Sequence, residues 1–167
     1  MKRRPNTTKI IFAIYGFILI WIVLFKMAFS VDEIRWLQAT RTVNMIPFYY
    51  DTDVGRIQTR EVLLNVIVFI PMGLYLKMFA LSGSKAILYG FFSSFVFEFC
   101  QFLFAIGGSD ITDIITNTFG TVIGVCLYAL LRKIFSNKQK ADRFINRAAS
   151  IALLIFCTLV VLLFLAN

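Results

Sequence analysis

The sequence contains no histidine, only 3 cysteines and no CxxC pair. Zinc and haem sites usually depend on imidazole or paired thiolate ligands, so sites of those kinds are disfavoured. Cys100, Cys126 and Cys157 all fall inside apolar runs, where a cysteine commonly fills space as a small hydrophobic side chain. We therefore expect neither a disulfide framework nor a metal centre built on cysteine and histidine.

Charge is also scarce. Only 16% of the residues are charged, 9 of them acidic, whereas 59% are hydrophobic. Five separate apolar runs each extend for about twenty residues, which is the length that crosses a ~30 Å hydrocarbon core. The composition predicts an all-α, polytopic transmembrane helical bundle, with 1–167 forming a single membrane domain. The predicted spans are 10–29, 61–81, 86–106, 111–135 and 148–166.

The basic residues are unevenly placed along the chain. They gather before residue 10, around the connection at 77–85 and in the connection at 132–147, while the alternate connections carry balancing acids. This is the positive-inside bias, so we expect the N-terminus in the cytoplasm and the C-terminus outside. The net charge of +8 therefore reflects membrane topology, and nucleic acid is not expected as a partner.

The first apolar run has a competing interpretation as a cleaved signal peptide. A basic start precedes it, and the tripeptide Ala28-Phe29-Ser30 resembles a cleavage site. The uncharged run from 10 to 25 is at the long edge for the apolar region of a signal peptide, which favours an uncleaved membrane anchor.

The stretch 107–124, GGSDITDIITNTFGTVIG, introduces polar groups into the fourth span. Asp110, Asp113 and Asn117 are spaced i, i+3, i+7 and share one face of a helix. Such groups are costly in lipid unless they face protein or water. Gly120 and Gly124 form a GxxxG pair, which is typical of a close helix contact.

Two other spans carry polar residues at similar heights. With a rise of 1.5 Å per residue, Asp113 lies ~3 Å below the outer ends of the spans, and Asn65 lies ~6 Å below them. Gln101, Asn117 and Glu98 lie ~8, ~9 and ~12 Å below the same plane. We infer one polar pocket between the second, third and fourth spans, open to the outer leaflet.

The connections support this arrangement. The turn at 107–109 makes the third and fourth spans antiparallel neighbours. A helix pair held close by Gly120 and Gly124 would form the back wall of the pocket. The segment 31–60 mixes charges with aromatic rings, which suits the headgroup level. We interpret it as an interfacial or partly re-entrant cap on the outer face, with a simple tether as the alternative.

Each polar group also has a purely structural interpretation. Asp110 can cap the fourth helix, with Asp113 as its capping-box partner. The amides of the three spans can form interhelical hydrogen bonds worth ~0.6 kcal/mol each. Glu98 can be a protonated carboxyl group bonded to an amide.

Four blocks in order resemble the VanZ-like family: RTVNMIPF (41–48), NVIVFIPMG (65–73), EFCQ (98–101) and DITDIITNTFG (110–120). The resemblance covers a core of about 41–124. It implies a multi-pass protein of the bacterial cytoplasmic membrane, and the namesake of the family is associated with teicoplanin resistance. The family pattern has an Arg shortly before the first Asp, where this chain has GGS. If the pocket needs a positively charged side chain, Arg41 or Arg60 would have to supply it.

Three functions remain open at this point. The first is binding or modification of an envelope lipid or lipid-linked cell-wall precursor at the outer leaflet, contributing to glycopeptide resistance. The candidate ligand-binding residues are Arg41, Asn44, Arg60, Asn65, Glu98, Gln101, Asp110, Asp113 and Asn117. The other two functions are a membrane enzyme acting on a lipid-linked phosphate or acyl substrate and a non-catalytic assembly partner.

The enzyme hypothesis needs its own set of residues. Glu98, Asp110 and Asp113 would hold a divalent cation such as Mg²⁺ through oxygen ligands. Glu98 and Asp113 are the candidate catalytic groups, acting through the metal or as acid and base. Without this metal we expect no cofactor. A transporter is disfavoured because the chain has no visible internal repeat. The oligomeric state is open.

Overall fold

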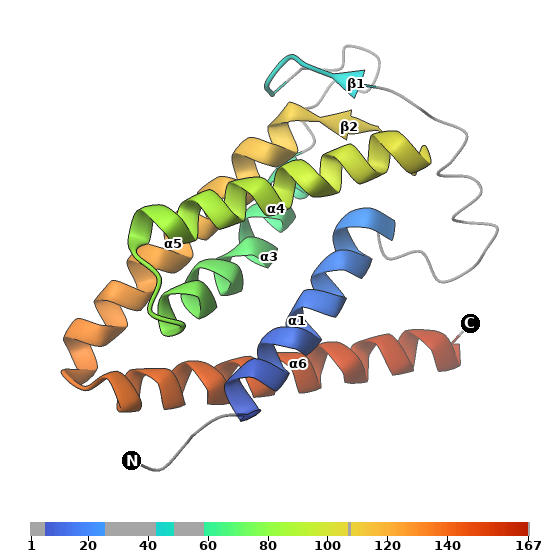
Figure 1. Cartoon of the computed structure of the whole chain (residues 1–167). Helices are drawn as coiled ribbons and strands as arrows, with labels where there is room; N and C mark the ends of the chain where they lie inside the picture. Colours follow the sequence, from blue (N-terminus) through green and yellow to red (C-terminus); the bar gives the residue numbers. More distant parts are fainter. Residues whose placement is uncertain (1–5, 26–42, 49–58, 107, 167) are drawn as a thin grey trace. The chain divides into compact units, whose positions relative to one another are not determined.

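A computed structural model describes residues 6–25, 43–48, 59–106 and 108–166. These residues are almost entirely helical: α1 (Asn6–Phe25), α3 (Thr59–Met78), α4 (Gly83–Phe104), α5 (Ile111–Phe135) and α6 (Lys138–Ala166). Two short strands, β1 (Val43–Asn44) and β2 (Ser109–Asp110), complete the described elements (Figure 1). All five helices are long and apolar enough to cross a membrane, which confirms the predicted class.

The helix bounds differ most from the prediction at α6. It begins at Lys138, whereas the predicted span begins at residue 148. Asn137 caps this helix, because its Oδ1 accepts hydrogen bonds from the backbone N–H groups of Gln139 and Lys140. Ala141 and Ile145 are buried four residues apart, while the charged positions face outward. The basic connection is thus mostly an amphipathic extension of the last helix.

The chain divides into two compact units. One comprises residues 1–18 and 130–167, and the other comprises 19–129. In the first unit, Asn146 Nδ2 donates a hydrogen bond to Thr8 Oγ1 at 2.8 Å, and the rings of Phe135 and Phe144 lie 5.3 Å apart. In this way the end of α5 and the start of α6 join the start of α1. The second unit contains all the described candidate site residues.

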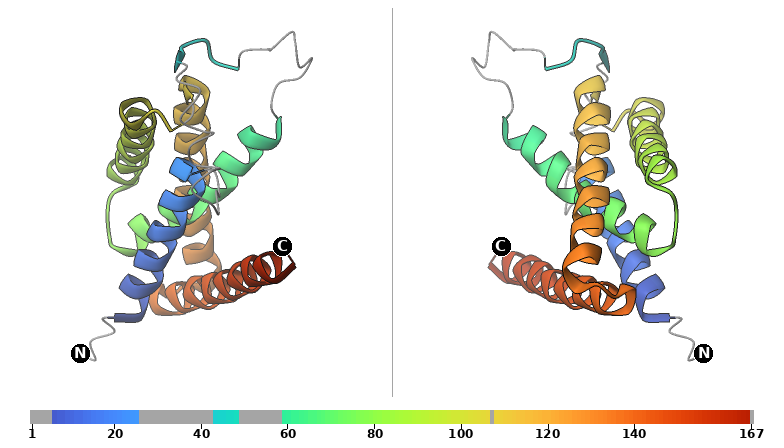
Figure 2. Two further views of the ribbon diagram at one scale, coloured as in Figure 1. Left: turned by 90° about the vertical axis from the view of Figure 1, so that its right-hand side faces the viewer. Right: turned by 90° about the vertical axis from the view of Figure 1, so that its left-hand side faces the viewer.

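Within the second unit, α3 crosses α5 (Figure 2). The two helices meet there at glycines, which form a seam. A Cβ atom at Gly120 would overlap the carbonyl oxygen of Val66, and one at Gly124 would overlap that of Ile70. From the α3 side, a Cβ atom at Gly73 would overlap the carbonyl oxygen of Thr121. Such backbone contact allows Cα–H groups to face carbonyl oxygens across the interface. The prediction that Gly120 and Gly124 hold a helix pair close is confirmed, and α3 is their partner.

On another side of α5, α4 runs antiparallel to it, as the short turn predicts. Gly90 lies against the side chain of Thr121, and further along α4 the hydroxyl of Ser94 accepts a hydrogen bond from Asn117 Nδ2 at 2.9 Å. Residues later in α4 therefore contact residues earlier in α5, as expected for antiparallel helices. The helix α4 ends at Phe104, and its C-cap residue Ala105 has a φ of 53°, a left-handed conformation. The chain then turns into β2 and α5.

Candidate functional site: two pockets beside the start of helix α5

A parallel strand pair joins the segment 43–48 to the start of α5. Val43 pairs with Ser109, and Asn44 pairs with Asp110. Asn44 Nδ2 donates to Asp110 Oδ2 at 3.0 Å, and the backbone N–H of Phe48 donates to Thr112 Oγ1 at 3.0 Å. This part of the expected cap is therefore bonded to the helix bundle. A strand of two residues is too short to show the alternation of apolar and polar residues that marks a strand, so the pairing was not predicted from the sequence.

Asp110 caps α5 as predicted, but its capping-box partner is not Asp113. Asp110 Oδ1 accepts a hydrogen bond from the backbone N–H of Thr112 at 2.7 Å. The backbone N–H of Asp110 donates to Glu98 Oε2 of α4 at 2.8 Å. A carboxylate from a neighbouring helix thus takes the role that the sequence assigned to Asp113. Ser109 Oγ adds a bond to the carbonyl oxygen of Glu98 at 2.8 Å.

Asp113 instead points to α3. Its Oδ1 accepts a hydrogen bond from Asn65 Nδ2 at 2.7 Å. Gln101 Nε2 donates to the carbonyl oxygen of Val23 at 2.9 Å, near the end of α1, where the last carbonyls of a helix lack partners within it. Together with the Asn117–Ser94 bond, these contacts link four helices. The amides therefore have the interhelical role that the structural interpretation predicted.

Two amide oxygens remain unsatisfied. Gln101 Oε1 and Asn117 Oδ1 are buried and accept no hydrogen bond from any residue in the described part of the chain. Leaving a buried polar group without a partner costs about 1–3 kcal/mol. Both oxygens are therefore acceptor positions for a donor from water or from a ligand.

One pocket, here called the polar pocket, lies between α1, α3, α4 and α5. Its volume is about 410 Å³. The lining residues are Ile22, Val23, Arg60, Glu61, Leu64, Asn65, Gln101 and Asp113. Four of the predicted binding residues meet here: Arg60, Asn65, Gln101 and Asp113. Arg60 and Glu61 are exposed, and Gln101 is buried.

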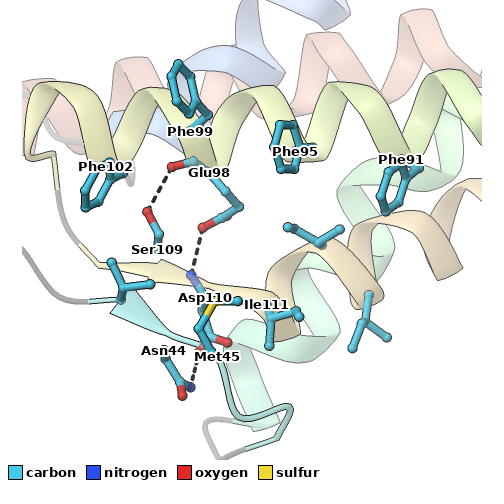
Figure 3. A pocket seen from close by; sticks show the side chains of 13 residues that line it. Asn44, Met45, Phe91, Phe95, Glu98, Phe99, Phe102, Ser109, Asp110 and Ile111 are labelled. Atoms are coloured by element: carbon cyan, nitrogen blue, oxygen red, sulfur yellow. Dashed lines mark hydrogen bonds between the residues drawn. The ribbon is translucent and has the colours of Figure 1, made fainter.

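A second pocket, here called the apolar groove, lies along α4, the start of α5 and β1 (Figure 3). Its volume is about 580 Å³. The lining residues are Val43, Asn44, Met45, Phe91, Phe95, Glu98, Phe99, Phe102, Ser109, Asp110, Ile111, Ile114 and Ile115. The predicted residues Asn44, Glu98 and Asp110 lie here.

The single pocket expected from the sequence is therefore divided into two. Asn117 lines neither pocket and joins α5 to α4 instead. Arg41 lies outside the described residues. The fourth span faces both pockets because Asp110 and Asp113, three residues apart, turn toward different neighbours.

The three carboxylates proposed as metal ligands make separate contacts. Glu98 bonds the backbone of Asp110, Asp110 bonds Asn44 and Thr112, and Asp113 bonds Asn65. Among the described residues, no three His, Cys, Asp or Glu side chains gather closely enough to hold a metal ion. The described geometry thus offers no site in which these three carboxylates share a cation.

The fold and the pockets define a multi-pass helical membrane protein with polar side chains paired inside the helix bundle. The chain belongs to the VanZ/LLP1 family, whose model matches residues 12–132. It is 41% identical over 141 residues to Protein VanZ of Enterococcus faecium, a match that covers 80% of each chain. No solved structure matches it. Together with the five apolar helices, this similarity identifies the chain as a multi-pass bacterial membrane protein. The matched region extends beyond the core of 41–124 on both sides.

Proposed function

We propose that the protein binds the polar part of a cell-envelope lipid or lipid-linked cell-wall precursor in the outer leaflet. Through this binding it contributes to resistance to the glycopeptide teicoplanin, the activity associated with the namesake of its family. The observation that carries the proposal is the polar pocket. It gathers one cation, two acids and two amides among helices that otherwise suit lipid.

The chemistry of the pocket suits a phosphate- or carboxylate-bearing headgroup. Arg60 offers a guanidinium group, which binds both anions through paired hydrogen bonds. Gln101 Oε1 offers a buried acceptor to a hydroxyl or amide N–H of the same ligand. Ionisable groups inside a membrane usually mark a functional site, because their insertion is costly.

The predicted topology supports access from outside the cell. The positive-inside bias places the first residues of α3 and α5 at the outer end of the bundle. Arg60, Glu61 and Asp113 all lie within the first turn of these two helices. A headgroup in the outer leaflet would then reach the pocket without crossing the membrane.

The proposal is tested by deleting the gene and complementing it with the wild type, Arg60→Gln or Arg147→Gln. Arg147 is an exposed cation in the other unit of the chain and serves as the matched control. We expect the deletion and Arg60→Gln to lower the inhibitory concentration of teicoplanin and to alter the pools of lipid-linked precursors. The Arg147→Gln strain should behave as the wild type does. Unchanged susceptibility and unchanged precursor pools in the deletion strain would refute the proposal.

The hydrogen-bonded amides favour a second candidate, a non-catalytic assembly partner. The side chains of Asn65, Gln101 and Asn117 all donate to groups on neighbouring helices. In that role the polar residues serve helix packing alone, and every variant that loses function also loses its fold. Variants that lose function while remaining folded in detergent would rule this role out.

A further inference from the structure

The apolar groove has a ladder of phenylalanines along one wall. Phe91, Phe95, Phe99 and Phe102 follow one another along α4 at intervals of three or four residues and line the groove. Figure 3 shows Phe91, Phe95 and Phe102 on the side of α4 toward Ile111 and Phe99 at the edge of the helix. Ile111, Ile114 and Ile115 of α5 form the facing wall, and Val43 and Met45 close the end beside the strands. Apolar side chains thus line most of the groove.

The polar groups that line the groove are engaged with one another. Glu98 Oε2 accepts from the backbone of Asp110, Ser109 Oγ donates to the carbonyl of Glu98, and Asn44 donates to Asp110. A polar ligand that entered the groove would lose its hydrogen bonds to water, and the Phe and Ile walls offer none in exchange. The walls therefore select a hydrocarbon occupant.

The size of the groove favours a single chain over a helix. The eleven-residue separation of Phe91 from Phe102 corresponds to about 16 Å along α4. A volume of about 580 Å³ lies within the range of sites that hold a single small ligand, about 300–1,000 Å³. A transmembrane helix is about 30 Å long and would extend well beyond the groove. The length and the volume of the groove therefore suit one extended hydrocarbon chain.

We propose that the apolar groove is a binding site for one hydrocarbon chain of a membrane amphiphile. The chain lies along the phenylalanine ladder, with its end near the β1–β2 pair. This site is separate from the polar pocket, with which it shares no lining residue, and it does not depend on the proposed function. An acyl or polyprenyl chain supplies the required chemistry.

The experiment uses the full-length protein in vesicles of phosphatidylethanolamine and phosphatidylglycerol. A phosphatidylglycerol that carries a diazirine in one acyl chain is the probe, and mass spectrometry locates the photo-adducts. We expect adducts on Phe95, Phe99 and Ile114 to exceed those on Phe92 about tenfold, the ratio that 1.4 kcal/mol of binding free energy produces. Phe92 lies on the same helix, is similarly exposed and does not line the groove.

Two matched pairs of variants make the test specific. Phe95→Gln places an amide in the groove, and Phe92→Gln makes the same change outside it; the two phenylalanines are 49% and 52% exposed. Ile115→Trp fills the groove, and Ile67→Trp enlarges an exposed isoleucine of α3 elsewhere. The groove adducts at Phe99 should fall about tenfold in Phe95→Gln and Ile115→Trp and remain unchanged in both controls.

Three outcomes would overturn the proposal. The first is equal labelling of Phe92 and the groove residues, which would make the groove ordinary lipid-facing surface. The second is an equal fall in groove adducts in Phe92→Gln and Phe95→Gln. The third is a cross-link between two copies of the chain at these positions, which would identify a helix of a second copy as the occupant. Loss of teicoplanin resistance in Arg60→Gln with normal groove labelling would separate this site from the polar pocket.

Discussion

Helix α5 is held by its two neighbours in different ways. Against α3, it presents Gly120 and Gly124, whose missing side chains let the two backbones touch. Against α4, it presents Asn117 and the start of the helix, which are joined by side-chain hydrogen bonds. The first interface depends on shape and has no room for an added atom. The second depends on individual bonds of modest energy. Single substitutions there can leave the protein folded, so they can test whether a residue serves function as well as stability.

The largest effect is expected at the glycine seam. Gly124→Ala would place a methyl group on the carbonyl oxygen of Ile70. Neither group can move away unless one of the two helix backbones shifts. We expect a loss of unfolding free energy at the upper end of overpacking costs, about 3 kcal/mol. Gly16→Ala is the control, because nothing lies within 4 Å of a Cβ atom at Gly16. Unfolding in mixed micelles measures both variants, and equal stability would contradict the shape-based interface.

A smaller loss is expected when the backbone N–H of Asp110 loses its acceptor. Glu98→Ala leaves this N–H at the start of α5 without the carboxylate, at a cost of about 1–3 kcal/mol. Glu98→Gln keeps an acceptor oxygen and should be closer to the wild type. Stability and teicoplanin susceptibility are measured together. A Glu98→Ala protein that stays folded but loses function contradicts the assembly role, whereas simultaneous loss of fold and function supports it.

Loss of the helix cap should cost about 1 kcal/mol. Asp110→Ala removes the side-chain acceptor for the N–H of Thr112, and a missing N-cap typically costs that amount. Asp110→Asn is the matched control, because Asn caps helices as well as Asp does. Thermal unfolding in detergent compares the two variants. If Asp110→Asn were as unstable as Asp110→Ala, the charge of Asp110 and the bond that its Oδ2 accepts from Asn44 would matter more than its capping bond.

The smallest effect is expected for a single amide bond between α4 and α5. A double-mutant cycle on Asn117→Ala and Ser94→Ala isolates their hydrogen bond. The coupling should be about 0.6 kcal/mol, the average for polar pairs inside membranes. A coupling as large as the effect of Gly124→Ala would remove the contrast between the two interfaces.

Local patterns in the sequence were sufficient for much of the fold. Five apolar runs predicted five spans, the GxxxG pair predicted a close helix contact, and Asp110 was recognisable as an N-cap. These features depend only on helix periodicity, on the length that crosses a membrane and on bonds between residues close in the chain. The prediction that the amides form hydrogen bonds between helices also followed from their positions on the helix faces.

The choice of partners was decided by the tertiary structure. The sequence indicated that Glu98, Asp113 and Asn65 lie at similar heights, but not that Glu98 bonds the backbone of Asp110 while Asp113 bonds Asn65. Such choices depend on the rotation of each helix about its axis, which contacts between distant residues set. The polar pocket, the apolar groove and the β1–β2 pair all arise at that level, because each of them combines segments that are far apart in the chain.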